Sequence, residues 1–244
     1  MIQLSDSQLS SGGEDHSQKD PYFRMRTFAL HALQNIFKLN CKVIFNHYWY
    51  LLLPSFIIRQ PQELFSKAKF STKFEQALAN EPTLVAMIMK EKALKIRISA
   101  TVALSTLLEN SPISKWLGPL EKNNEGKVII KYDKPLTTSS TAITPLSQTL
   151  GLIIRFMHYI LIFLIQRERA HLDFLYREHG QITDFTAFHL ISQLVKLAGT
   201  LVSVTPYVKM CEGLLSSLLV PHISDLLFNY DDEFLKAAAI HCFM

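Results

Sequence analysis

Histidine is the side chain most often used for metal binding and acid–base catalysis, and this chain has nine. Glu168 and His171 follow the Glu-x-x-His spacing, which places a carboxylate and an imidazole on one face of a helix, as in di-iron bundles. Such a centre needs a second copy of the motif and further inward carboxylates, and the sequence contains neither. The charged residues around the pair instead indicate a solvated helix end. We therefore expect no metal site and no cofactor.

Catalytic groups of other kinds are equally scarce. Cys41 and His47 fall on a segment that is typical of a core helix, so packing explains them better than a nucleophile–base pair. His158 and His189 lie on apolar segments, where we expect core histidines with satisfied hydrogen bonds. The sequence has no Gly-rich phosphate loop and no GxSxG, HExxH or Walker pattern. It therefore predicts a protein without catalytic residues.

Lysines form the remaining group of candidate residues. Within residues 61–135, twelve Lys or Arg stand against eight Asp or Glu, although the formal net charge of the chain is only +4. Six of these lysines are candidates for an anion-binding or partner-binding surface, the lysine ridge: Lys67, Lys69, Lys73, Lys90, Lys92 and Lys95. Grouped lysines attract polyanions such as RNA or an anionic membrane. However, Glu75, Glu81 and Glu91 dilute the charge, and a charged run is also typical of a solvated face.

A short phrase occurs three times and indicates which elements carry these residues. Each copy has an apolar residue, a basic residue, and then small and apolar residues at fixed offsets. The copies are Met25, Arg26, Ala29, Ala32, Leu33, Ile36 and Phe37; Ile96, Arg97, Ala100, Ala103, Leu104, Leu107 and Leu108; and Leu235, Lys236, Ala239, Cys242 and Phe243. These offsets form one stripe of an α-helix, and the alanines allow a neighbouring helix to approach closely.

The basic residue of the phrase has two interpretations. Arg26 and Arg97 are suited to anion contacts, but their fixed place in the phrase favours a structural brace to an acidic side chain or to backbone carbonyls of the adjacent turn. Lys236 replaces arginine in the third copy, and lysine lacks the planar fork that allows bidentate pairing.

A helix with such a stripe cannot bury it alone, so the three copies predict stacked helix pairs. We expect an all-α fold, an α-solenoid of HEAT/armadillo-like helix pairs over residues 20–244 that winds as a right-handed superhelix. The expected helices span 21–39, 42–56, 84–90, 94–109, 145–178, 185–204 and 207–230, with a break at Pro221, and Asp231 and Asp232 cap a last helix. A disordered leader (1–19), a polar insertion (59–80) and one long irregular loop (about 117–144) complete the chain.

Composition agrees with this architecture. Hydrophobic residues make up 48% of the chain, and only 8 glycines accompany 16 phenylalanines, which favours long helices over turn-rich β structure. Cys41, Cys211 and Cys242 lie far apart and form no CxxC pair, so we expect free thiols in a reducing, intracellular compartment, either cytoplasmic or nuclear.

Two apolar runs are too short to cross a membrane, because a spanning helix needs about 20 apolar residues. Arg155 and His158 interrupt the run at 150–165, and His47 and Pro54 interrupt the run at 43–58. We expect both runs to form helices buried among other helices, and no transmembrane segment.

The last copy of the phrase stops in mid-pattern. Leu235, Ala239, Ile240 and Phe243 belong to a stripe for which the sequence supplies no further partner helix. We therefore expect a truncated array that exposes this stripe.

Several segments, taken in order, resemble one family. They are the run that begins at Arg26 and continues to residue 34, Trp49 with Pro54, Arg97 with its alanines, residues 144–150 around Pro145, and residues 194–207. Together they resemble the uncharacterised domain of the HEAT repeat-containing protein 6 family, from about residue 20 to the C-terminus. The resemblance implies a HEAT-type superhelix without known catalytic residues, and it carries no active site over to this chain. One departure is that the turn Asp20-Pro21 before the first copy becomes Glu91-Lys92 before the second.

These observations predict a non-enzymatic scaffold or adaptor that holds a protein partner of unknown identity along its curved surface. The alternative is a polyanion-binding module that uses the lysine ridge. Binding to generic RNA that weakens steeply with salt would favour the alternative.

Overall fold

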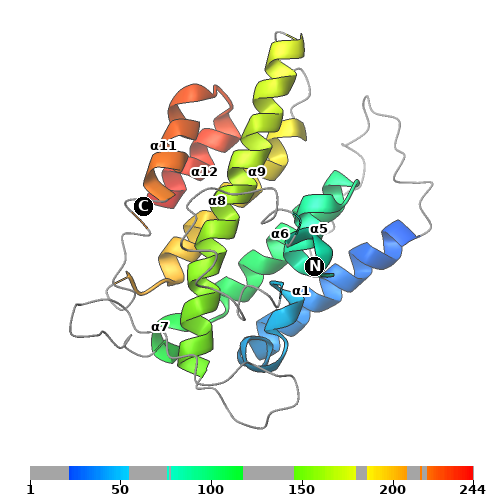
Figure 1. Cartoon of the computed structure of the whole chain (residues 1–244), viewed down its shortest axis with the longest axis vertical. Helices are drawn as coiled ribbons and strands as arrows, with labels where there is room; N and C mark the ends of the chain where they lie inside the picture. The colour runs from blue at the N-terminus through cyan, green and yellow to red at the C-terminus, as the bar shows by residue number, and fades with distance from the viewer. Residues whose placement is uncertain are drawn as a thin grey trace, which may run out of the picture.

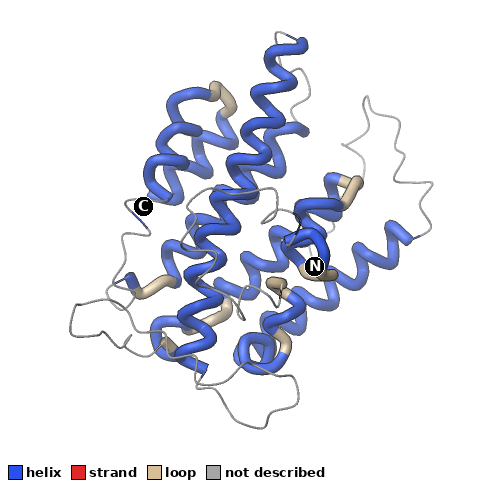
Figure 2. Tube along the Cα trace, viewed as in Figure 1, coloured by secondary structure: helices blue, strands red, loops and turns tan. Residues whose placement is uncertain are grey.

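The computed structural model describes residues 22–54, 76, 78–117, 146–179, 186–207, 215 and 219–243. Over these residues the chain is helical and contains no strand, as the helices and short loops of Figure 2 show. The predicted all-α class is therefore confirmed for the described part of the chain. The expected leader (1–19), most of the insertion and nearly all of the long loop lie outside it.

The first helix, α1 (Tyr22–His47), merges two of the predicted helices. Its backbone leaves helical geometry only at Asn40 (φ −138°, ψ 40°), which lies between the two predicted spans. The second span was predicted to reach residue 56, which is wrong. The helix ends at His47, and a single 3₁₀ turn, η2 (Trp49–Leu51), follows.

The next two helices, α5 (Leu84–Lys90) and α6 (Leu94–Glu109), have the bounds that the sequence predicts. Thr83 precedes α5, and its hydroxyl accepts a hydrogen bond from the amide of Ala86 at 3.1 Å, as an N-cap should. The one-turn helix α7 (Ile113–Trp116) was not predicted. Its Trp116 ring packs edge-on against Phe45 of α1, and Leu117, the expected first residue of the long loop, is buried.

The remaining helices are α8 (Leu146–His179), α9 (Thr186–Val204), α11 (Val220–Asn229) and α12 (Glu233–Phe243). The spans of α8 and α9 agree with the prediction to within a residue. Pro221 stands in the first turn of α11, where its missing N–H is harmless. The Asp232 carboxylate accepts a hydrogen bond from the amide of Leu235 at 2.7 Å, which confirms the predicted cap of the last helix.

The helices form a row with a second layer on it. In the row, α1 packs against α6, α6 against α9, and α9 against α12. The second layer consists of α5, α8 and α11, which pack on α6, α9 and α12 respectively, and we call these three the outer helices. Figure 1 shows α1 at one end of the row, α11 and α12 at the other, and the long α8 in front. Each outer helix precedes its row helix in the sequence, so the described chain contains three successive helix pairs.

Small residues set the closest approaches in the row. Ala100 and Ala103 of α6 are fully buried, as the second copy of the phrase predicts. In α9, a Cβ on Gly199 would lie 3.3 Å from the Cα of Cys242, so glycine allows α12 to pack closely there.

The first and third copies of the phrase depart from the prediction. In α1, Leu33 and Phe37 face the interior, but the other four stripe residues are exposed: Met25, Ala29, Ala32 and Ile36. At the C-terminus, Leu235 and Ala239 are fully buried, because α12 packs against both α9 and α11. Only Ile240 and Phe243 of the stripe that was expected to be exposed are about half exposed.

Candidate functional site

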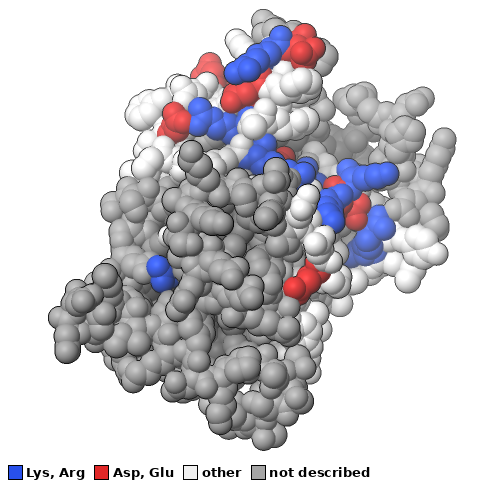
Figure 3. Space-filling view, in the orientation of Figure 1, with Lys and Arg blue, Asp and Glu red and all other residues white. Residues whose placement is uncertain are grey.

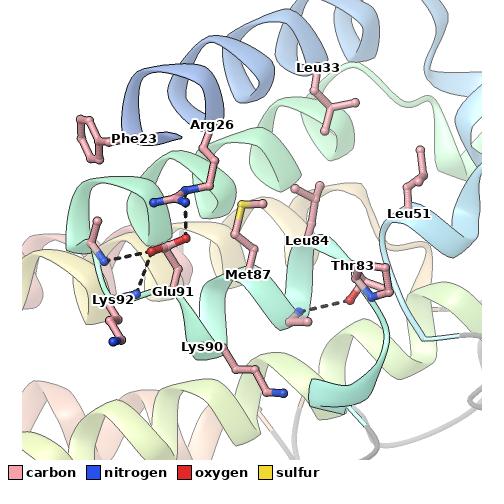
Figure 4. Close-up of a pocket in the computed structure, with 13 residues that line it drawn as sticks. Phe23, Arg26, Leu33, Leu51, Thr83, Leu84, Met87, Lys90, Glu91 and Lys92 are labelled. Atoms are coloured by element: carbon pink, nitrogen blue, oxygen red, sulfur yellow. Dashed lines mark hydrogen bonds and ion pairs between the residues drawn. The ribbon is translucent and has the colours of Figure 1, made fainter. Parts of the chain in front are cut away.

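A groove opens between α1, η2 and α5, with a volume of about 760 Å³. Its floor is apolar, because Leu33 of α1 faces Leu84 and Met87 of α5 across it (Figure 4). The other lining residues are Phe23, Arg26, Leu51, Pro82, Thr83, Ala86, Lys90, Glu91, Lys92 and Ala93. We call this site the α1–α5 groove.

An ion pair closes one end of the groove. Nε of Arg26 lies 3.2 Å from a carboxylate oxygen of Glu91, and Figure 4 shows the two side chains facing each other between α1 and the turn after α5. The other carboxylate oxygen of Glu91 accepts hydrogen bonds from the amides of Lys92 (2.9 Å) and Ala93 (3.3 Å), which directly precede α6. Glu91 therefore ties α1, α5 and α6 together at the mouth of the groove.

The lysine ridge is present in part at this mouth. Lys90, Lys92 and Lys95 are all exposed, and the first two line the groove. Lys67, Lys69 and Lys73 lie outside the described residues. Figure 3 shows the basic side chains of this face in a band that is interspersed with acidic ones. The dilution of charge that the sequence indicated is therefore visible on the described surface, where Glu91 stands between Lys90 and Lys92.

The arginine of the second copy is a brace, as the sequence favoured. Nε of Arg97 donates to the carbonyl of Ile88 on α5 at 2.6 Å, and its guanidinium also pairs with the Glu168 carboxylate on α8. Both side chains are largely buried. Arg26 makes the equivalent contact to Glu91. Arg97 thus links α6 to α8, the outer helix of the following pair, and Arg26 links α1 to the turn directly after α5. Within the described residues, Lys236 pairs locally, with the exposed Asp231.

A family of domains with no known function, DUF4042, has a model that matches residues 24–244. The chain belongs to the DUF4042 family. The match includes every residue of the groove except Phe23. No curated protein and no solved structure matches the chain.

The two members of the Glu-x-x-His pair of this DUF4042 chain lie in different surroundings. Glu168 is buried and held by Arg97, whereas His171 is exposed. The prediction of a solvated helix end is therefore wrong for Glu168, because α6 packs close enough to supply a buried partner. Nowhere in the described part of the chain do three potential His, Cys, Asp or Glu ligands gather around one point.

His158 is a core histidine, as expected. One ring nitrogen lies 2.7 Å from the carbonyl of Ile154 and the other 2.8 Å from the hydroxyl of Tyr207. Burial lowers the pKa of His158 to about 4, so the neutral ring donates to Ile154 and accepts from Tyr207. His189, in contrast, is exposed on α9, and the expectation of a core position there is wrong.

Cys41 and His47 do not form a reactive pair. The thiol of Cys41 donates to the carbonyl of Asn110 at 3.1 Å, and His47 is exposed at the end of α1. Burial raises the pKa of the Cys242 thiol to about 11, which suppresses thiolate formation at neutral pH.

Sequence reasoning did not find the groove. Its walls come from α1, η2 and α5, and the segment 55–75 between them lies outside the described residues. No local pattern connects Phe23, Leu51 and Met87.

Among the described helices, none has the length and apolar character to span a bilayer.

Proposed function

We propose that this DUF4042 chain is a non-enzymatic scaffold, a HEAT-type solenoid of helix pairs that binds a protein partner at the α1–α5 groove. Three features support the solenoid. The row helices pack in sequence order, each outer helix precedes its row helix, and an arginine brace recurs at the same position of the phrase in α1 and α6. Stacked pairs of this kind present extended surfaces for binding.

The open groove is the observation that carries the proposed binding activity. An apolar floor with charged groups at its mouth is the usual composition of a protein-binding site, where apolar contacts provide affinity and the polar rim provides register. Leu33, Leu84 and Met87 supply the floor, and Lys90 and Lys92 supply the rim. Glu91 lowers the positive charge between Lys90 and Lys92, which weakens the attraction of this rim for a polyanion.

Met87→Glu tests the proposal, because it places an unpaired carboxylate on the partly buried floor. The matched control is Leu227→Glu, which puts the same charge on a partly buried apolar residue of α11. Proteins captured from cell extract by the wild-type chain should be lost with Met87→Glu and retained with Leu227→Glu, with both variants folded by circular dichroism. Equal capture by both variants would contradict the proposed site.

Polyanion binding is the other outcome of the same experiment. Titration with generic RNA at rising salt should show no binding, or binding that Lys90→Glu with Lys92→Glu leaves unchanged. Tight binding that is lost with salt and with these two changes would replace the proposal.

The widely spaced cysteines, none in a CxxC pair, lead us to propose an intracellular location in the cytoplasm or nucleus.

A further inference from the structure

One side of α1 carries a strip of exposed apolar side chains. Phe28 is 71% exposed and Leu39 is 80% exposed. They belong to the α1 stripe, whose exposed members recur at steps of three and four residues along the helix: Met25, Phe28, Ala29, Ala32, Ile36 and Leu39. The stripe is roughly 20 Å long at 1.5 Å per residue. A continuous apolar surface of this kind marks a site of interaction with a protein or a membrane.

The largest side chains of the stripe point away from the core. Leu30 and Phe37 are buried and mark the side of α1 that faces the rest of the protein. Phe28 lies two residues before Leu30, so at about 100° per residue it stands on nearly the opposite side of the helix. Leu39 lies two residues after Phe37 and points the same way. Among the described helices, α1 stands at one end of the row, so this side is an outer surface (Figure 1).

The stripe is separate from the α1–α5 groove. From α1, the groove takes Phe23, Arg26 and Leu33, and none of these three belongs to the stripe. The stripe is instead the convex surface of a helix from which single side chains protrude. A protein partner needs a complementary hollow for each of them, whereas the loosely packed boundary of a lipid bilayer adapts to protruding side chains.

Exposed cations border the stripe along one edge. Arg24, His31 and Lys38 recur every seven residues and therefore form one row along the helix, and Lys42 follows them. Phe28 has Arg24 four residues before it and His31 three residues after it, so the row lies directly beside the stripe. α1 contains no acidic residue.

These cations are available for a ligand. None of Arg24, Lys38 and Lys42 forms an ion pair with another described residue. Arg97, in contrast, is neutralised by Glu168. A row of unpaired positive charge beside an exposed apolar strip is the pattern of a helix that lies on an anionic membrane surface.

We propose that the α1 stripe and its basic border bind the surface of an anionic lipid bilayer, with α1 parallel to the membrane. Phe28 and Leu39 enter the boundary between the headgroups and the acyl chains, and the cations contact anionic headgroups. A nucleic acid engages cations alone and leaves the stripe exposed to water, so the stripe decides in favour of lipid. This surface is distinct from the proposed partner site, and it places a partner held in the groove next to a membrane.

Cosedimentation of the full chain with lipid vesicles tests the inference. One set of vesicles contains phosphatidylcholine mixed with phosphatidylserine, and the other contains phosphatidylcholine alone. The chain should bind the phosphatidylserine vesicles at least about tenfold more tightly, because each cation near an anionic surface contributes about fivefold. Circular dichroism checks that every variant below is folded.

The apolar contribution is tested by Phe28→Ser combined with Leu39→Ser. Removing two inserted side chains should weaken binding to the phosphatidylserine vesicles at least about tenfold. The matched control is Phe174→Ser combined with Phe228→Ser, which removes two exposed apolar side chains from α8 and α11 and should leave binding unchanged.

The electrostatic contribution is tested by Arg24→Gln combined with Lys38→Gln. Loss of these two charges should weaken binding to the phosphatidylserine vesicles about 25-fold. The matched control is Arg177→Gln combined with Lys196→Gln, which removes two exposed charges from α8 and α9 and should have no effect.

Several results would overturn the inference. One is equal binding to both kinds of vesicle or to neither, and another is equal loss in the α1 variants and their controls. Loss with the charge changes but not with the serine changes would indicate a polyanion surface instead. A photo-crosslinking residue in place of Ala32 that joins residues 1–21 or a second copy of the chain, with phosphatidylserine vesicles present, would identify a different occupant of the stripe.

The same assay separates this inference from the proposed function. Met87→Glu changes the floor of the groove and should leave vesicle binding intact, whereas loss of vesicle binding would place the lipid in the groove and overturn the inference. If partner capture depends on Met87 while the α1 variants bind vesicles as the parent does, the membrane surface is wrong and the scaffold proposal stands.

Discussion

His158 shows how one buried residue couples stability to pH. Its pKa is about 4 in the folded chain and 6.5 when solvated, so folding favours the neutral ring. The stabilisation is complete above pH 6.5 and is lost as the pH falls towards 4, because the unfolded chain then binds a proton that the folded chain rejects. The free energy of unfolding should fall by up to about 3 kcal/mol over this window. Urea titrations at several pH values measure it.

The control for His158 is His158→Gln, which cannot titrate in this window. The difference in unfolding free energy between the two proteins should change across the window, since carboxylate protonation is common to both. Parallel pH profiles for the two chains would show that His158 is not the coupled group.

Arg97 supports a second prediction at the residue scale. Arg97→Ala removes the partner of the Glu168 carboxylate, whose side chain is only 11% exposed, and it also leaves the Ile88 carbonyl without this donor. Breaking such a buried pair should cost about 3 kcal/mol. Arg97→Lys should lower the free energy of unfolding by less than Arg97→Ala does, because lysine keeps the charge. It should still be less stable than the parent, because lysine lacks the fork that reaches both acceptors.

Lys236→Ala is the matched control, since it deletes the basic residue of the third copy. Its partner Asp231 is fully exposed, and exposed pairs contribute little. Thermal melts should separate Arg97→Ala clearly from the parent and leave Lys236→Ala unchanged. Indistinguishable melting of all three chains would mean that Arg97 is not a brace.

At the scale of elements, Ala32 and Ala103 occupy the same position of the phrase in different surroundings. Ala103→Leu overpacks the fully buried face of α6 and should destabilise the chain by about 1–3 kcal/mol. Ala32→Leu adds the same atoms to an exposed position of α1, so its effect should stay within about 0.5 kcal/mol. Denaturant titrations of the two variants provide the comparison. Equal losses would show that α1 is covered in solution.

At the scale of the whole molecule, the row predicts a gradient of local stability. α6 lies between α1 and α9, and α9 lies between α6 and α12, whereas among the described helices α1 has a row neighbour on one side only. In stacked arrays, stability depends largely on contacts with nearest neighbours. Amide hydrogen exchange should therefore be slowest in α6 and α9 and faster in the first half of α1. Uniform protection across the described helices would indicate one cooperative unit instead.

Local patterns in the sequence determined the helices themselves. The spans of α5, α6, α8 and α9 follow from caps, helix-stopping residues and apolar spacing, all of which act within a few residues. The bracing role of Arg97 followed from its place in the phrase, although its partner Glu168 did not. The sequence also predicted the stripe on α1, with Ala32 on it.

Tertiary structure alone decided which apolar faces are covered. Periodicity shows that a helix has an apolar stripe, but burial depends on whether another helix packs there, and Ala32 and Ala103 have the same local pattern with opposite exposure. The groove is likewise a property of arrangement, since its residues come from elements distant in sequence. Contacts across long separations, such as Arg97 with Glu168, arise only when the row brings the pairs together. The physical reason is that local propensity acts along the chain, whereas packing joins surfaces that the chain keeps apart.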